Sequence, residues 1–278
     1  MTTILDSFKR LSYRPELLRP VQKLGLSSAL RRAYFHFAKP ANGILETQIA
    51  GNPARFFIRT PEELRILESA GGAGGEQRVM ELLKDFLRPG DVALDIGANV
   101  GLYSVLLARA VGPSGRVFAC EPGRLNSQHL TENLELNGLK NVQVFRKALA
   151  DRSGTAKLYA SAVIGNSSLS DSAAGNAPAE EVEVIEGDRL IESENLPTPR
   201  AVKIDVEGFE YAVMNGLRRT LEKDACQLVV CEIHPSLLPE GIQPPMVTRF
   251  LGACGFDQIQ TYARWDGTFH LAAFKPRP

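Results

Sequence analysis

Residues 95–101, Asp-Ile-Gly-Ala-Asn-Val-Gly, have the composition of a ligand-binding turn between a strand-like apolar run and a helix-like one. Gly97 and Gly101 let the backbone turn sharply and approach a ligand, and the free N–H groups of the following helix point to the same place. Three residues separate the two glycines, unlike the Gly-x-Gly-x-x-Gly of dinucleotide-binding turns. Asp95 would repel a polyphosphate, so it suits a ligand with an ammonium or sulfonium group.

Glu121 follows the next apolar run, twenty positions after Gly101. An acidic residue at this place in a β-α-β unit accepts hydrogen bonds from both ribose hydroxyls. Together with Asp95 it predicts a site for a ligand that joins adenosine to a positively charged group. The simpler interpretation is that Asp95 caps a turn and Glu121 lies at a solvated strand end.

Two further strands end in charged residues. Asp205 and Glu207 follow the run at 201–204, and Glu232 and His234 belong to the run at 228–234. Residues two apart on an extended backbone point to one side, so each pair is expected to face one way, although one acid could cap the next helix. Of the four histidines, only His234 is expected in the predicted crevice, and a structural role for it stays open.

Strands and helices must alternate to bring these segments together. Strands are expected at 92–96, 117–120, 142–145, 201–205 and 228–233, with helices at 102–111, 124–137, 209–223 and 245–254 between them and a final hairpin at 257–274. This alternation predicts an α/β fold with a doubly wound, mostly parallel sheet and helices on both faces. A further strand at 181–185 follows a long loop at 160–179, which we expect to contact the substrate together with Trp265.

The first 75 residues differ from the rest and are expected to form an N-terminal extension, with the main domain at 76–278. Residues 1–42 carry eight Lys and Arg against two acids. We interpret them as a helical arm packed on the domain, or as a docking surface for a membrane or an acidic partner. A hairpin is expected at 44–59, with its turn at 51–53, and a glycine-rich joint at 71–75.

Composition narrows the class of protein. Lys and Arg together number 32, as do Asp and Glu, so net charge gives no attraction to nucleic acid. The cysteines, at 120, 226, 231 and 254, lack zinc-site spacing and are expected to be buried free thiols, which suits a cytoplasmic protein. No apolar stretch is long enough to cross a bilayer, and charges interrupt any secretory signal.

The strings VALDIGANVGLYS, FACEP, VKIDVEGFE and VVCEIHP, in this order, resemble the FkbM family of class I S-adenosylmethionine-dependent methyltransferases over roughly residues 76–235. The resemblance implies a Rossmann-like, seven-stranded sheet with an antiparallel last strand. It also implies methyl transfer from S-adenosyl-L-methionine to a hydroxyl oxygen of a sugar, glycan or natural product. The residues that it assigns to the cofactor are Asp95, Gly97, Ala98, Asn99, Gly101, Glu121, Ala148 and Asp205.

The expected reaction is an in-line displacement at the sulfonium methyl, with Asp205, Glu207, Glu232 and His234 as the catalytic candidates. His234 could take the hydroxyl proton while Glu232 or Glu207 orients it, or Asp205 and Glu232 could hold a divalent cation. The glycine spacing disfavours a nicotinamide dehydrogenase. Val206, where base-methylating enzymes carry a Pro-Pro-aromatic string, disfavours nucleic acid. A non-catalytic module that only binds the cofactor stays open, and neither the acceptor nor the oligomeric state is predicted.

Overall fold

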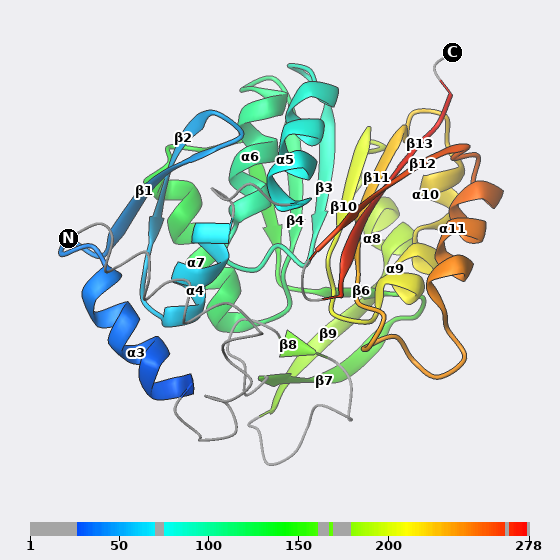
Figure 1. Cartoon of the computed structure of the whole chain (residues 1–278). Helices are drawn as coiled ribbons and strands as arrows, with labels where there is room; N and C mark the ends of the chain where they lie inside the picture. Colours follow the sequence, from blue (N-terminus) through cyan, green and yellow to red (C-terminus); the bar gives the residue numbers. More distant parts are fainter. Residues whose placement is uncertain (1–26, 70–74, 161–166, 169–178, 265–266, 277–278) are drawn as a thin grey trace.

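The computed structural model describes residues 27–69, 75–160, 167–168, 179–264 and 267–276 (Figure 1). A seven-stranded sheet, in the order β12-β13-β11-β10-β3-β4-β5, forms its centre. The strands from β11 to β5 are parallel, and β13 pairs antiparallel with β11 and β12. The Rossmann-like fold with its antiparallel last strand is therefore confirmed. The strands are β3 (Val92–Ile96), β4 (Arg116–Cys120), β5 (Val142–Phe145), β10 (Ala201–Ile204), β11 (Leu228–Ile233), β12 (Gln258–Ala263) and β13 (Phe269–Phe274).

Helices cover both faces of this sheet (Figure 1). Successive residues of a strand point to opposite faces, so Val117 and Ala119 of β4 enter one core while Phe118 and Cys120 enter the other. The first face carries α5 (Gly75–Phe86), α6 (Leu102–Val111) and α7 (Arg124–Leu136). The second carries α8 (Gly187–Ser193), α9 (Glu210–Gly216), α10 (Arg218–Glu222) and α11 (Pro244–Ala253).

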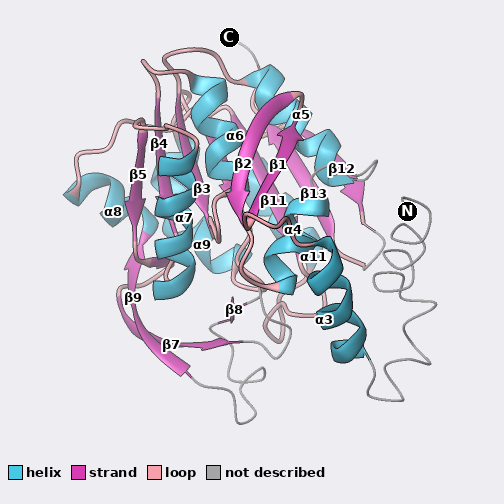
Figure 2. Ribbon diagram, turned by 90° about the vertical axis from the view of Figure 1, so that its left-hand side faces the viewer, coloured by secondary structure: helices cyan, strands magenta, loops and turns pink. Residues whose placement is uncertain are grey.

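A second, smaller sheet has the order β6-β9-β7-β8. The strand expected at 181–185 is β9 (Ala179–Glu186), which belongs to this sheet and pairs with β6 (Ala148–Ala150) and β7 (Gly154–Ala160). Figure 2 shows β7 and β9 extending beyond one end of the main sheet. The expected long loop includes the short strand β8 (Ser167–Ser168); residues 161–166 and 169–178 lie outside the described residues.

The described part of the N-terminal extension contains α3 (Ser27–Ala38), the predicted hairpin of β1 (Ile44–Ile49) and β2 (Asn52–Phe57), and α4 (Pro61–Ser69). The hairpin turn was expected one residue too late. The residues with positive φ are Ala50 and Gly51, so the turn closes before β2 begins.

The extension packs on the helices that cover the first face of the main sheet rather than standing apart from them. Phe56, Leu64 and Leu67 share a core with α5, α6 and α7. Asn133 of α7 is fully buried, accepts a hydrogen bond from the Phe57 amide and donates one to the Val100 carbonyl. The Asn133 side chain thus connects the extension to the turn that follows β3.

Two further expectations can be compared with the structure. All four cysteines are free and buried, as predicted. Among the described residues, no helix combines the length and the apolar character needed to cross a membrane. The first 26 residues of the basic segment lie outside the described residues.

Candidate active site

The turn between β3 and α6 is held against the ends of two neighbouring strands. Gly97 has a φ of 75°, and its amide donates a hydrogen bond of 2.9 Å to the Cys120 carbonyl. A Cβ atom at Gly97 would lie 1.8 Å from the carbonyl oxygen of Asp205. Only glycine fits between these strand ends, which explains why the sequence has one there.

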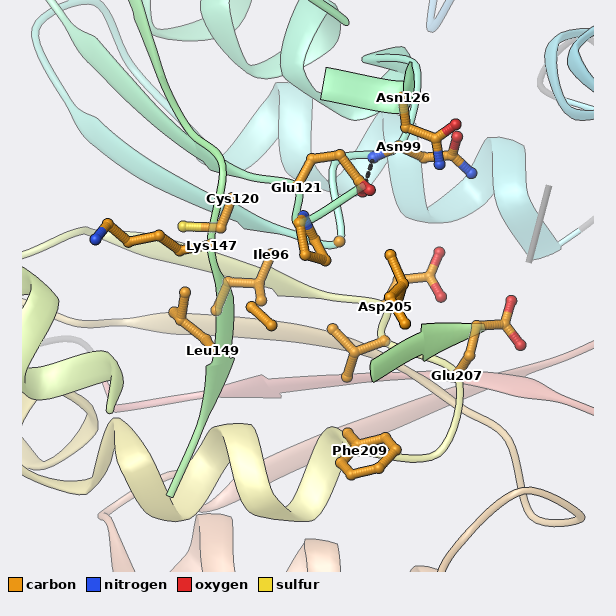
Figure 3. A pocket seen from close by; sticks show the side chains of 15 residues that line it. Ile96, Asn99, Cys120, Glu121, Asn126, Lys147, Leu149, Asp205, Glu207 and Phe209 are labelled. Carbon is orange, nitrogen blue, oxygen red and sulfur yellow. Dashed lines mark hydrogen bonds between the residues drawn. The ribbon is translucent and has the colours of Figure 1, made fainter. Parts of the chain in front are cut away.

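Glu121, at the end of β4, faces the same turn (Figure 3). Its carboxylate accepts hydrogen bonds of 2.9 Å from the amides of Asn99 and Gly123. Burial raises the pKa of Glu121 to about 7, although these hydrogen bonds oppose the rise. A buried carboxylate of this kind is suited to accept hydrogen bonds from two ribose hydroxyls.

A cavity runs from Glu121 to the end of β10. Figure 3 shows Cys120 and Leu149 at one end of the cavity. Asp205 and Glu207 lie at the other end, with their carboxylates directed away from Cys120 and Leu149. An apolar end for a flat base, an acid for the ribose and acids for a positively charged group fit S-adenosylmethionine. The lining residues are Ile96, Gly97, Asn99, Cys120, Glu121, Pro122, Asn126, Lys147, Ala148, Leu149, Leu158, Asp205, Val206, Glu207 and Phe209.

Two of the residues that the family resemblance assigns to the cofactor, Asp95 and Gly101, line neither this cavity nor the second one described below. Asp95 is fully buried; it accepts a 2.6 Å hydrogen bond from Ser104, and its carboxylate lies 3.3 Å from Lys203 Nζ. Gly101 packs against Leu130 of α7, where a Cβ would lie 2.6 Å from Leu130 Cδ1. In this structure Asp95 therefore acts on the site through Lys203, and its direct contact with the cofactor stays a prediction.

Lys203 is the main residue that the sequence analysis missed in this region. Its ammonium group donates a 3.0 Å hydrogen bond to the Gly97 carbonyl and lies 3.7 Å from the Asp205 carboxylate. The signal was present in the sequence, because Lys203 and Asp205 are two apart on one strand and must point to one side.

A second cavity adjoins the first, and the two share Gly97, Asn99, Asp205 and Glu207. Its walls come from the extension, from α5 and α6, from β10 and β11, and from the chain between β12 and β13. The residues that line only this cavity are Arg65, Ile66, Glu76, Ala98, Val100, Leu102, Tyr103, Lys203, Glu232, His234, Arg264 and Thr268.

The four catalytic candidates converge where the cavities meet. His234 Nε2 lies 3.6 Å from Glu207, 3.8 Å from Glu232 and 3.9 Å from Asp205. On its other side, His234 Nδ1 lies 2.7 Å from the buried carboxylate of Glu210. The sequence analysis missed Glu210, which it placed only within a helix.

The charges around this cluster shift its pKa values in opposite directions. Burial alone would lower the pKa of His234, but the Glu210 hydrogen bond and the nearby acids raise it to about 10. Burial and the charge of Asp205 raise the pKa of Glu207 to about 7. Burial opposes ionisation of Glu232 too, but its contacts with His270 and Arg264 lower its pKa to about 2.

His234 is the one histidine among the residues that line the two cavities, and a second histidine, which lines neither, contacts the acids of this region. His270 of β13 is the antiparallel partner of Glu232 and places Nε2 3.4 Å from its carboxylate. Arg264 contacts Glu76 and lies 3.4 Å from Glu232, while the Tyr103 hydroxyl donates a 2.6 Å hydrogen bond to Glu76. These contacts depend on the register of the last hairpin, which the sequence did not determine.

Two groups of side chains have the types and spacing to hold a divalent cation. One is Asp205, Glu207 and His234; the other is Glu76, Glu232 and His270. The sequence analysis paired Asp205 with Glu232 as cation ligands. In the structure the two acids belong to different groups, one in each. Carboxylates beside a histidine suit several first-row metals as well as harder cations, so the residue types alone do not choose the ion.

The comparisons with known proteins agree with this geometry. Residues 95–257 match the model of the methyltransferase FkbM domain. The hexuronic acid methyltransferase AglP of Haloferax volcanii is 31% identical over 73% of this chain and 78% of its own. A protein-L-isoaspartate O-methyltransferase of Aeropyrum pernix is 42% identical over 27% of each chain.

Among solved structures, the methyltransferase FkbM from Methylobacillus flagellatus superposes with a TM-score of 0.50 at 16% identity. The match covers 72% of this chain and about half, 51%, of that one. At this identity the likeness supports the fold alone. Taken with the match to the family model and the relative in Haloferax volcanii, the chain belongs to the FkbM methyltransferase family and is an S-adenosylmethionine-dependent O-methyltransferase.

Proposed function

We propose that this enzyme methylates a hydroxyl group of an acidic sugar, either free or within a glycan. The observation that carries the proposal is the cluster of Asp205, Glu207 and His234 at the junction of the two cavities. A hydroxyl is a weak nucleophile, so a proton acceptor or a cation must lie beside the transferring methyl. The relative named as a hexuronic acid methyltransferase supports a sugar acceptor.

In this proposal the base is Glu207 rather than His234. S-adenosylmethionine supplies the electrophilic methyl group, and the cavity walls align the acceptor oxygen with it and exclude water. With a pKa of about 10, His234 carries its proton at neutral pH and cannot accept another. Glu207, with a pKa of about 7, lines both cavities and takes the hydroxyl proton, while His234 orients it from 3.6 Å.

A divalent cation is the alternative, and one observation favours it. A metal-binding histidine usually donates its other ring N–H to a carboxylate, and Glu210 occupies that position beside His234 Nδ1. In that case Asp205, Glu207 and His234 would hold the cation, which would gather two sugar hydroxyls and lower the pKa of one.

The test is methyl transfer from labelled S-adenosylmethionine to a panel of hexuronic acid glycosides, neutral glycosides and small phenols. Transfer to a hydroxyl of a glycoside is the expected result, and transfer to phenols alone would contradict the sugar proposal. The same assay after dialysis against a chelator distinguishes the two mechanisms. Loss of turnover that Mg²⁺ or Mn²⁺ restores would favour the cation, and full turnover would favour Glu207 as a free base.

We further propose that the protein is cytoplasmic, that residues 76–278 form its main domain, and that its acceptor is not a nucleic acid. Four buried free thiols suit a cytoplasmic protein, and the zero net charge disfavours a nucleic-acid acceptor. The basic residues of 1–42 are proposed to reach a membrane surface as an extension of the domain at 76–278. Sedimentation with anionic liposomes, for the full chain and a chain lacking 1–42, tests this, and equal partitioning would end the membrane proposal.

A further inference from the structure

Three arginine and lysine side chains line the second cavity: Arg65, Lys203 and Arg264. Two of them are already neutralised by the protein. Lys203 lies 3.3 Å from Asp95 and 3.7 Å from Asp205, and only 5% of its side chain is exposed. Arg264 contacts Glu76 and lies 3.4 Å from Glu232. Neither is available to balance the charge of a ligand without breaking contacts that it already makes.

Arg65 differs from both. It is half-buried on α4, and among the described residues it forms no ion pair with an acidic side chain. A guanidinium group on the wall of a cavity, partly removed from water and without a carboxylate partner, is suited to bind an anionic ligand. Its planar fork matches a carboxylate in particular.

The helix that carries Arg65 is firmly placed. Leu64 and Leu67, on either side of Arg65 in the sequence, are buried in the core shared with α7. Glu63 accepts a 3.0 Å hydrogen bond from the Thr60 amide at the start of α4 and lies 2.7 Å from His129 of α7. A rigid platform lowers the entropy that would be lost when Arg65 binds a ligand.

Three of the acids that line the cavity gather at one place on its wall. Asp205, Glu207 and Glu232 lie around His234, at the junction with the cofactor cavity. An acceptor with a carboxylate would be repelled from these acids and attracted to Arg65. Its uncharged hydroxyl face would then be the part that enters the cluster where methyl transfer takes place.

We propose that Arg65 binds the carboxylate of the acceptor and so selects acidic sugars and sets which hydroxyl reaches the methyl group. This inference rests on the proposed sugar-methylating function. Residue 65 lies outside the family match at 95–257, so this element belongs to the extension rather than to the FkbM domain. The N-terminal extension would therefore carry the selectivity and the shared domain the chemistry.

The test compares the purified wild type with Arg65→Gln and Arg65→Lys. The acceptors are hexuronic acid glycosides of gluco and galacto configuration and the matching carboxamides, which keep the hydrogen-bonding groups but lose the charge. Arg65→Gln should lower kcat/KM for the acids by about 10- to 100-fold and change that for the amides by less than about threefold. Arg65→Lys should retain part of the activity toward acids, because it keeps the charge but loses the fork.

Arg78→Gln is the matched control, since Arg78 is an exposed arginine of α5 that does not line the cavity. Calorimetric titration with S-adenosylmethionine should give the same Kd for all the variants. Equal turnover of acids and amides by the wild type, or equal losses for both in Arg65→Gln, would overturn the role of Arg65 and leave sugar methylation intact. No transfer to any glycoside by the wild type would overturn both proposals.

Discussion

The two cavities of the active site are built in different ways. The cofactor cavity comes mainly from short segments that follow β3, β4, β5 and β10. Its fit depends on the close backbone approach at Gly97 and on acids at strand ends, among them Glu121. The adjoining cavity is lined by charged side chains that lie far apart in the sequence, from Arg65 to Arg264. A ligand common to a family can be bound by a compact local motif, whereas an acceptor specific to one enzyme is bound by distant side chains.

The largest effect should follow from filling the space at Gly97, where the two cavities meet. Gly97→Ala places a Cβ 1.8 Å from the Asp205 carbonyl oxygen at a φ of 75°. We expect loss of detectable S-adenosylmethionine binding in calorimetry and a fall of roughly 3 kcal/mol in the free energy of unfolding. Gly138→Ala is the control, because its φ is 68° but nothing lies within 4 Å of its Cβ.

Gly138→Ala should cost about 1–2 kcal/mol of stability, from its left-handed conformation alone, and leave the cofactor Kd unchanged. If Gly97→Ala bound S-adenosylmethionine as tightly as Gly138→Ala, the cofactor would not depend on the close approach of β3 and β10. Close backbone approach would then not be what distinguishes the cofactor cavity from the adjoining one.

Glu207→Gln should separate chemistry from cofactor binding. We expect kcat to fall by about 10²- to 10⁴-fold and the Kd for S-adenosylmethionine to change far less, because the variant keeps the shape of the side chain but cannot accept a proton. In the wild type, kcat/KM should rise with pH through about 7, as Glu207 loses its proton. His234→Gln should lose less activity than Glu207→Gln, and the opposite order would return the role of base to His234.

The difference between the cavities also explains what could be predicted from the sequence. The main sheet follows from alternating apolar runs, and Gly97, Glu121 and Asp205 follow from their places at strand ends. Arg65, Glu76, Arg264 and His270 could not be found this way, because their positions depend on how α4, α5 and the last hairpin pack. The partner of Asp95 could have been found, since Lys203 and Asp205 are two residues apart and must point to the same side of a strand that lies next to β3.

The smallest effect on cofactor binding concerns Glu121, whose protonation also makes stability depend on pH. Its pKa is about 7 in the folded protein and near 4.5 when unfolded, so the folded protein holds a proton between these values that the unfolded chain releases. The stability of the cofactor-free protein should therefore fall as the pH rises from 4.5 to 7, with roughly 3 kcal/mol attributable to Glu121. The free energy of unfolding, measured with urea at pH 5 and pH 8, should therefore decrease more in the wild type than in Glu121→Gln, and the difference is the contribution of Glu121.

Affinity for S-adenosylmethionine should change in the opposite direction, because the ribose hydroxyls donate hydrogen bonds to the ionised carboxylate. We expect the wild type to bind about tenfold more tightly at pH 8 than at pH 6, and Glu121→Gln to bind about equally at both. Glu222→Gln, at an exposed position on α10, is the control and should keep the wild-type dependence. A wild-type affinity that does not change with pH would remove Glu121 from the ribose and leave it as a support for the turn at Asn99, with which it shares a hydrogen bond.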